Sequence, residues 1–202
     1  MMSRQVKELA GRPREFDSDA ALAKAMNVFW KHGFSKTTYA ALEEATGLHR
    51  QSLVYAFGDK KALFHVVLQH YARTKVQTFI NQLQAPGSPL ANIQSAFDCW
   101  LEDARQESTS GCLFVNTSGE LGLTEPVFAE VIEQSTQQLL QAYHQVIQAG
   151  QSQGEIVSHI DALDLAKQAV AVGDGALLRS RVSGDTSLAE GAFRAFLTSI
   201  KH

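Results

Sequence analysis

Apolar residues recur along much of the chain at the spacing of one helix face. Near the N-terminus, Leu22, Ala25, Met26, Phe29 and Trp30 follow the i, i+3, i+4, i+7, i+8 order of an amphipathic helix. No stretch alternates convincingly between apolar and polar positions with the period of two that a half-buried strand requires. The pattern therefore predicts an all-α protein with about nine helices.

Capping residues and glycines divide the N-terminal part into short helices. Asp, Ser and Thr side chains accept hydrogen bonds at the start of a helix, whereas glycine ends one by adopting left-handed backbone angles. Two short helices joined by a tight turn at Gly47 fit the helix-turn-helix pattern. The expected caps and breaks are, in order, Asp17 or Ser18, Gly33, Thr38, Gly47, Gly58 and Asp59.

Longer helices follow. The helix capped by Asp59 extends to about Leu83, and the segment APGSP at 85–89 forms a turn. Pro126 suits the first turn of a later helix. Further helices are expected at about 89–107, 111–121, 125–152, 161–183 and 187–200. The chain thus divides into a flexible basic arm (1–15), a helix-turn-helix domain (16–76) and a larger helical domain (77–202).

Charge is distributed unevenly between these parts. Residues 1–76 carry 12 basic and 7 acidic side chains, a net charge of +5, whereas residues 77–202 carry 6 basic and 14 acidic ones, a net charge of −8. A basic N-terminal third on an acidic body favours contact with a polyanion such as DNA. Chance clustering on a solvated surface is the alternative that charge alone leaves open.

Composition narrows the class of protein further. No apolar run is long enough to span a bilayer, and no apolar segment of a signal peptide follows the first residues, so we expect a cytoplasmic protein. The two cysteines, Cys99 and Cys112, do not make a disulfide scaffold. The histidines are scattered, and neither a glycine-rich phosphate loop nor a nucleophile–base set can be placed by spacing. We therefore expect no metal, no cofactor and no enzymatic activity.

Several short segments carry a resemblance to a known family. The N-terminal segments are GRPREFD (11–17), FWKHGF (29–34), TT (37–38), ATGL (45–48) and FGDKKALF (57–64). Their order and spacing over about residues 11–75 are similar to the DNA-binding domain of the TetR/AcrR family. A later segment, GCLFVN at 111–116 with Glu120, resembles one found in a broad subgroup of these regulators that includes thiol-based sensors.

The resemblance implies a three-helix DNA-binding domain, a ligand pocket among the middle helices and a homodimer formed by the last two long helices. Residues 77–202 then become the effector-binding and dimerisation domain. The implied function is a sequence-specific repressor that leaves a palindromic operator when a small-molecule effector binds. Many members carry Tyr at the position of Val54 and a polar residue at Ala56, so Tyr55 becomes the candidate aromatic contact with DNA.

The predicted recognition helix offers polar side chains near its N-terminus, where residues reach base edges in the major groove. Arg50 suits a bidentate contact with guanine, and Gln51 suits one with adenine. A solvated helix face is the alternative for this set, and packing against the first helix is the alternative for Tyr55. The candidate base and phosphate contacts are Thr38, Tyr39, His49, Arg50, Gln51, Ser52, Tyr55 and Lys60.

The basic side chains of the arm have two open interpretations. They can reach the minor groove, as the N-terminal arms of other DNA-binding proteins do, or belong to a tail that aids solubility. The residues concerned are Arg4, Lys7, Arg12 and Arg14.

An effector site requires an apolar cavity with a few polar groups. The middle helices supply aromatic and polar candidates, each of which can equally be plain core. Together they indicate a hydrophobic or electrophilic effector. The candidates are Phe97, Trp100, Leu101, Cys112, Phe114, Asn116, Glu120, Phe128, Tyr143 and His144.

Cys112 supports an alternative function. It follows Gly111 near the expected start of a helix, where the helix dipole lowers the pKa of a thiol and favours the reactive thiolate. A redox or electrophile sensor acting through Cys112 is therefore the second hypothesis, with a small buried hydrophobe as the structural alternative. A helical ligand carrier that kept a vestigial DNA-binding motif is a more distant third.

Overall fold

The structure is a computed structural model that describes residues 17–106 and 111–202, so the arm expected over residues 1–15 lies outside these ranges. α4, a π-helical turn and α5 form one continuous helix, so the ten labelled α-helices amount to nine separate helices in the described residues. These residues contain no sheet, which confirms the predicted all-α class. The elements are α1 (Ser18–Lys36), α2 (Tyr39–Thr46), α3 (Arg50–Phe57), α4 (Lys60–Tyr71), a π turn (Ala72–Val76), α5 (Gln77–Leu83), α6 (Pro89–Gln106), α7 (Leu113–Leu121), a 3₁₀ turn (Gly122–Thr124), α8 (Pro126–Ser152), α9 (Ala162–Ser183) and α10 (Ser187–Ile200).

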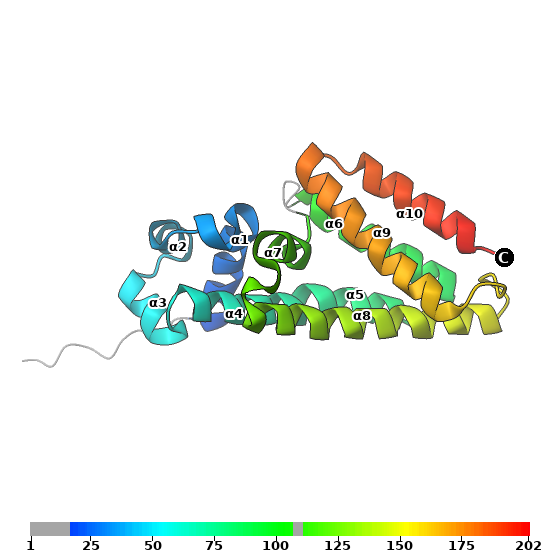
Figure 1. Cartoon of the computed structure of the whole chain (residues 1–202), viewed down its shortest axis with the longest axis horizontal. Helices are drawn as coiled ribbons and strands as arrows, with labels where there is room; N and C mark the ends of the chain where they lie inside the picture. Colours follow the sequence, from blue (N-terminus) through cyan, green and yellow to red (C-terminus); the bar gives the residue numbers. More distant parts are fainter. Residues whose placement is uncertain (1–16, 107–110) are drawn as a thin grey trace, which may run out of the picture.

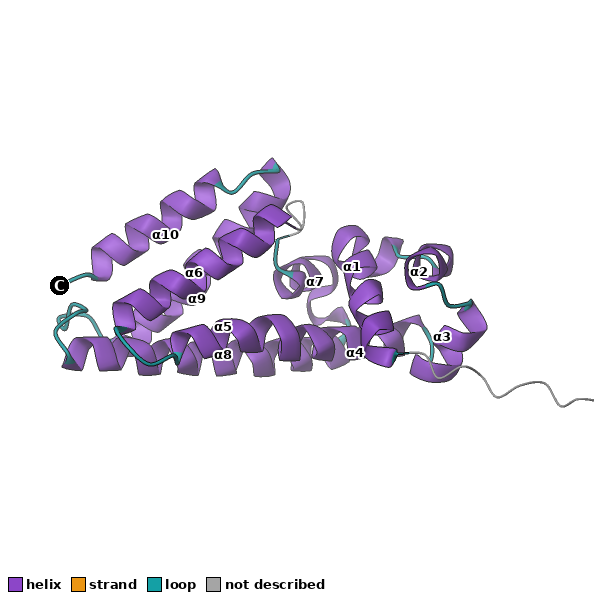
Figure 2. Cartoon of the chain, turned by 180° about the vertical axis from the view of Figure 1, so that it is seen from behind, coloured by secondary structure: helices purple, strands orange, loops and turns teal. Residues whose placement is uncertain are grey.

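The helices form an elongated molecule with α2 and α3 at one end and α10 near the other (Figure 1). The long helix α8 runs beside α4 and α5, and α9 packs on both α8 and α10. The view from behind shows α7 standing between α1 and the C-terminal helices (Figure 2). The fold therefore places the helix-turn-helix at the exposed tip of a larger helical body.

Local caps set the helix starts where the sequence predicts them. The Asp17 carboxylate accepts hydrogen bonds from the backbone N–H groups of residues 19 and 20, at 3.0 and 3.2 Å. The Thr38 hydroxyl accepts from the N–H of residue 41 at 3.2 Å, and the Asp59 carboxylate accepts from that of residue 62 at 2.8 Å. These bonds satisfy backbone donors that have no partner inside the helix.

Gly33 breaks α1 in a way that the sequence does not predict. We expect it to stop the helix as a left-handed cap, but its φ of 78° is combined with a ψ of 172°, and helical structure resumes up to Lys36. Thr37 closes this extra turn, because its hydroxyl donates a hydrogen bond to the Gly33 carbonyl at 2.6 Å. The break therefore turns the end of α1 and leaves the N–H groups after Gly33 without helical partners.

An aromatic cluster joins the helix-turn-helix to the helical body. The ring of Phe64 on α4 lies 4.7 Å from that of Phe29, 5.2 Å from that of Phe34 and 5.0 Å from that of Phe128 on α8. Phe29 and Phe128 are almost completely buried. The hydrophobic core is thus continuous from α1 into the C-terminal domain.

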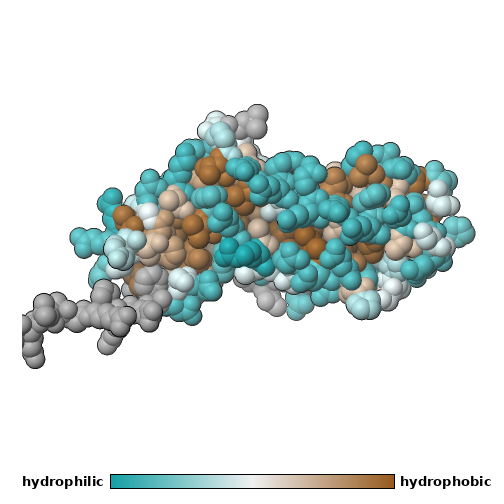
Figure 3. Space-filling view, turned by 90° about the horizontal axis from the view of Figure 1, so that it is seen from below, coloured by the Kyte–Doolittle hydropathy of each residue, from teal (hydrophilic) through white to brown (hydrophobic). Residues whose placement is uncertain are grey.

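The outer surface differs from this core. The face seen from below is mostly hydrophilic, with hydrophobic residues exposed in separate areas (Figure 3). Among the described residues, no helix has the length and apolar character needed to cross a membrane.

We expect substitution of Phe128 by alanine to lower the free energy of unfolding by about 3–5 kcal/mol, because a buried aromatic ring is replaced by a cavity between the two domains. Tyr55→Ala is the control, since 93% of Tyr55 is exposed, and its effect should stay within about 0.5 kcal/mol. Denaturant unfolding followed by circular dichroism measures both. Equal effects of the two substitutions would contradict the assigned role of the aromatic cluster.

Candidate DNA-binding surface and effector pocket

Helix α3, the predicted recognition helix, has a buried side and an exposed side. Leu53 is completely buried against the rest of the domain. The polar residues expected to read DNA, His49 to Ser52, are all exposed. The alternative in which Tyr55 packs on the first helix is wrong, because its side chain lies in solvent.

Contacts between α2 and α3 orient the first turn of the recognition helix. The Arg50 guanidinium lies 4.5 Å from the centroid of the Tyr39 ring, a cation–π distance. The Arg50 backbone N–H donates to the Glu43 carboxylate at 2.7 Å, and His49 Nδ1 lies 3.7 Å from the same oxygen. Because α3 has no side-chain cap of its own, Glu43 supplies the missing acceptor.

Lys60 has a structural role that the sequence does not reveal. Its Nζ donates to the carbonyls of Phe34 and Thr37, at 3.0 and 3.1 Å, and lies 4.6 Å from the centroid of the Phe34 ring. The ammonium group thus satisfies two carbonyls at the turned end of α1. An ammonium group has three N–H donors, so one is left for the phosphate contact that we expect of Lys60.

Glu120 lies at the same turn and not in a ligand pocket. Its carboxylate accepts hydrogen bonds from the backbone N–H groups of Phe34, at 2.9 Å, and Ser35, at 2.7 Å. Burial alone would raise the pKa of Glu120, but these hydrogen bonds and the charge of Lys60 outweigh it and lower that pKa. The expectation that Glu120 is a polar group for an effector is therefore replaced by a role at the domain junction.

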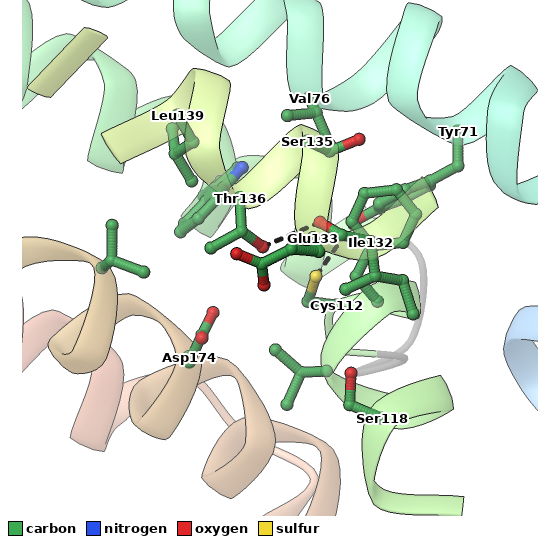
Figure 4. Close-up of a pocket in the computed structure, with 14 residues that line it drawn as sticks. Tyr71, Val76, Cys112, Ser118, Ile132, Glu133, Ser135, Thr136, Leu139 and Asp174 are labelled. Atoms are coloured by element: carbon green, nitrogen blue, oxygen red, sulfur yellow. Dashed lines mark hydrogen bonds between the residues drawn. The ribbon is translucent and has the colours of Figure 1, made fainter. Parts of the chain in front are cut away.

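A pocket of about 270 Å³ opens in the C-terminal domain between α4, the π turn, α6, α7, α8 and α9 (Figure 4). Of the ten effector candidates, it brings together Trp100, Cys112 and Phe114. Phe97 and Leu101 face α10 instead, where the ring of Phe97 stacks on that of Phe193 with a centroid distance of 4.2 Å. The remaining candidates also lie outside its lining: Asn116, Glu120, Phe128, Tyr143 and His144.

Sequence reasoning misses the polar residues of this pocket. Glu133 and Thr136 of α8 and Asp174 of α9 line it, together with Tyr71 at the end of α4. One signal was available, because Asp174 stands four residues after the half-buried Val170 and directly after the buried Gly173, so it places a charge at the edge of the face that α9 buries.

Asp174 is electrostatically unusual. The residue is exposed at the surface, but the protein atoms around its carboxyl displace part of the water. This partial loss of solvation raises the pKa of Asp174. Within residues 17–106 and 111–202, no hydrogen bond or ion pair to its side chain is found. Its charge reaches Tyr143, whose pKa is raised well above its ordinary value first by burial and then by Asp174.

The environment of Cys112 differs from the one predicted. Cys112 does precede the first turn of α7, but it is buried, and the Tyr71 hydroxyl donates a hydrogen bond to its sulfur at 3.4 Å. Burial raises the pKa of the thiol more than this bond and those from the backbone lower it. The expectation of a thiol with a lowered pKa is therefore wrong, because loss of solvation outweighs the helix dipole.

A helix-turn-helix at the tip of a helical body that contains a pocket defines a DNA-binding transcriptional regulator, and the comparisons with known proteins agree. Residues 21–67 match the family described as bacterial regulatory proteins, tetR family, and residues 89–196 match the tetracyclin repressor-like C-terminal domain. The chain belongs to the TetR family. The family and the relatives of this chain are transcriptional regulators and not enzymes.

Individual relatives support this assignment. The HTH-type transcriptional repressor ComR of Escherichia coli K12 is 33% identical over 168 residues, which cover 80% of this chain and 78% of ComR. A TetR family regulator from Agrobacterium tumefaciens has a similar structure, with a TM-score of 0.83 at 19% identity over 91% of this chain and 97% of that one. A cysteine mutant of the regulator CifR, complexed with 26-bp operator DNA, has a TM-score of 0.75 at 26% identity, covering 92% and 98% of the two chains.

We expect Cys112 to react slowly with iodoacetamide, at least about tenfold more slowly than free cysteine at pH 7.5, because only the thiolate attacks. Since burial raises its pKa, the rate should keep rising through pH 9, whereas that of a free thiol levels off near its pKa of about 8.5. A Cys99→Ser variant leaves Cys112 as the only thiol, and mass spectrometry follows its alkylation. Rapid alkylation at neutral pH would restore the thiol-sensing hypothesis.

Proposed function

We propose that this regulator is a homodimeric repressor whose α3 helices read a palindromic operator in the major groove, and that a small molecule in the pocket lowers its affinity for DNA. Its site of action is then the cytoplasm, where a bacterial regulator meets the chromosome. Base reading is assigned to Arg50 and Gln51. Phosphate contacts are assigned to Thr38, Tyr39 and Lys60, with His49, Ser52 and Tyr55 beside them.

One observation carries the effector part of the proposal: a single continuous helix leads from the DNA-binding domain into the pocket wall. It begins at Lys60, which is bonded to the end of α1, and it contributes Tyr71 and Val76 to the pocket. Between these two residues the helix widens into the π turn, a kind of irregularity that is frequent at functional sites. A ligand that displaces this segment changes the position of the helix-turn-helix.

The outer faces of α9 and α10 support the dimer. Several apolar and small residues of these two helices are core of the single chain, among them Gly173, Leu177 and Phe193. A second stripe remains exposed, with apolar and small residues at intervals of three and four on each helix. Its members are Ala171, Gly175, Leu178 and Val182 on α9 and Leu188, Gly191, Ala195 and Ser199 on α10.

A second copy of the chain fits this stripe. A side chain added at Gly175 or Gly191 would meet nothing within 4 Å in the single chain, so both positions are open to close approach of another helix. A two-fold axis through this face pairs α9 and α10 with their copies and presents two recognition helices on one side of a DNA duplex.

We expect Arg50→Ala to weaken binding to the operator by about 1–3 kcal/mol and to reduce discrimination between bases, because one bidentate contact is lost. The operator is obtained by selection from a random pool with the wild-type protein, and fluorescence anisotropy compares it with random DNA. Arg73→Ala removes an exposed positive charge from the π turn, outside α2 and α3, and is the matched control. Equal losses on operator and random DNA would show that Arg50 does not read bases.

We expect Leu178→Glu to convert the dimer into a monomer, since it places a carboxylate from each copy in the apolar interface at a cost of about 2 kcal/mol or more. Sedimentation velocity measures the change. Val54→Glu is the control, because Val54 is similarly exposed but lies on α3, and it should remain dimeric. A wild-type monomer, or a dimeric Leu178→Glu variant, would rule out this interface.

A further inference from the structure

The pocket combines aromatic walls with negative charge. Tyr71, Trp100 and Phe114 supply aromatic surface, while Glu133 from α8 and Asp174 from α9 direct their carboxylates into the same space (Figure 4). None of the described residues that line it is a lysine, arginine or histidine. The protein itself therefore places no positive charge in the lining to balance the two acids.

The two carboxylates are not occupied by strong internal partners. Glu133 accepts one hydrogen bond from the neutral Gln137 amide at 2.6 Å, and it remains exposed. For Asp174, no hydrogen bond or ion pair is found within the described part of the chain, although the surrounding protein makes its charge more costly. Because both carboxylates lie at one pocket, a cation bound there would gain Coulomb attraction to each of them.

The aromatic side chains suit the rest of such a ligand. The Trp100 ring reaches this space because Gly173 of α9 has no side chain; a Cβ there would lie 2.9 Å from Trp100 Cζ3. Aromatic faces attract organic cations through their quadrupole and also bury apolar groups. A volume of about 270 Å³ admits a small molecule below typical drug size.

We propose that the effector is an organic cation, an amine or quaternary ammonium with an apolar body, whose charge is held by Asp174 and Glu133 and whose body lies against Trp100, Tyr71 and Phe114. This inference rests on the proposed role of the pocket as the effector site. It replaces the expected hydrophobic or electrophilic effector by one that carries positive charge.

Three probes of similar size and shape test the charge preference on the full chain: 3-phenylpropylammonium, 3-phenylpropan-1-ol and 3-phenylpropionate. Tryptophan fluorescence and calorimetry report their binding at pH 7.5. We expect the ammonium to bind at least tenfold more tightly than the alcohol and the carboxylate to bind more weakly than both. Equal affinities for the ammonium and the alcohol, or no binding of the ammonium, would overturn the proposal.

Two substitutions assign the preference to the named residues. Asp174→Asn and Glu133→Gln should each weaken ammonium binding at least tenfold while changing alcohol binding less than twofold. Glu130→Gln is a matched control, because Glu130 also lies on α8 and accepts a hydrogen bond from the glutamine four residues later, Gln134, but does not line the pocket. Loss of ammonium binding in the control, or its persistence in both pocket variants, would overturn the assignment.

Operator binding, measured with and without each probe, separates this inference from the proposed function. Ammonium binding that leaves operator affinity unchanged would support the charge preference and contradict the effector role of the pocket. Release of the operator by the alcohol as effectively as by the ammonium would support the effector role and overturn the preference for a cation.

Discussion

The turn at Gly33 is the constraint on which the rest of the structure depends. Its φ of 78° is unfavourable for any residue with a side chain, and a Cβ at this position would lie 2.5 Å from Glu120 Oε2. Two N–H groups after this turn donate hydrogen bonds to the Glu120 carboxylate, and two nearby carbonyls accept hydrogen bonds from Lys60. One distorted turn thereby ties α1 to α7 on one side and to α4 on the other, so the placement of the helix-turn-helix on the body follows from it.

α7 extends this connection to the pocket. Glu120 lies near the C-terminal end of α7, and Gly111 precedes its N-terminal end. The Gly111 carbonyl accepts a hydrogen bond from Trp30 Nε1 at 3.1 Å. Arg181 of α9 donates to the Trp30 carbonyl at 2.9 Å, which brings a third helix to the same point. Since Cys112 and Phe114 line the pocket, α1 contacts through hydrogen bonds the same short helix that a ligand would touch. In the proposed function, these bonds give the pocket a second connection to α1, in addition to the one through α4.

How much could be predicted from the sequence follows from the range of each interaction. The caps Asp17, Thr38 and Asp59 are predictable because each bonds to an N–H group two or three residues away. Glu120 is not, because its partners lie 86 and 85 residues earlier in the chain. The exposed polar side of α3 is predictable residue by residue, because the helix is short and its buried side is set by local spacing. The contacts of those residues with DNA remain a prediction.

The pocket was predicted only in part, because helical spacing does not say which neighbour a face meets. Phe97 and Trp100 are three residues apart on α6, yet the Phe97 ring stacks on α10 and the Trp100 ring lies in the pocket beside Phe79, with a centroid distance of 4.0 Å. Aromatic character and helical spacing therefore predict a pocket position for both. Polar residues distinguish a pocket from the core better than aromatic residues do, because burying a polar group in the core lowers stability.

Around this pocket the cost is visible. The Tyr143 hydroxyl is buried with no hydrogen-bond partner among the described residues. Burial and the charge of Asp174 both raise its pKa. Buried polar groups left without partners destabilise a fold by about 1–3 kcal/mol each, and Asp174 adds a carboxylate whose pKa burial raises. At the turn after Gly33, by contrast, Glu120 and Lys60 supply hydrogen-bond partners for the backbone groups that the helix leaves unpaired. Departures from good folding chemistry concentrate where function requires them. The contrast between these two regions therefore supports the proposed ligand site in the pocket, whereas the satisfied groups after Gly33 hold α1 to α4 and α7.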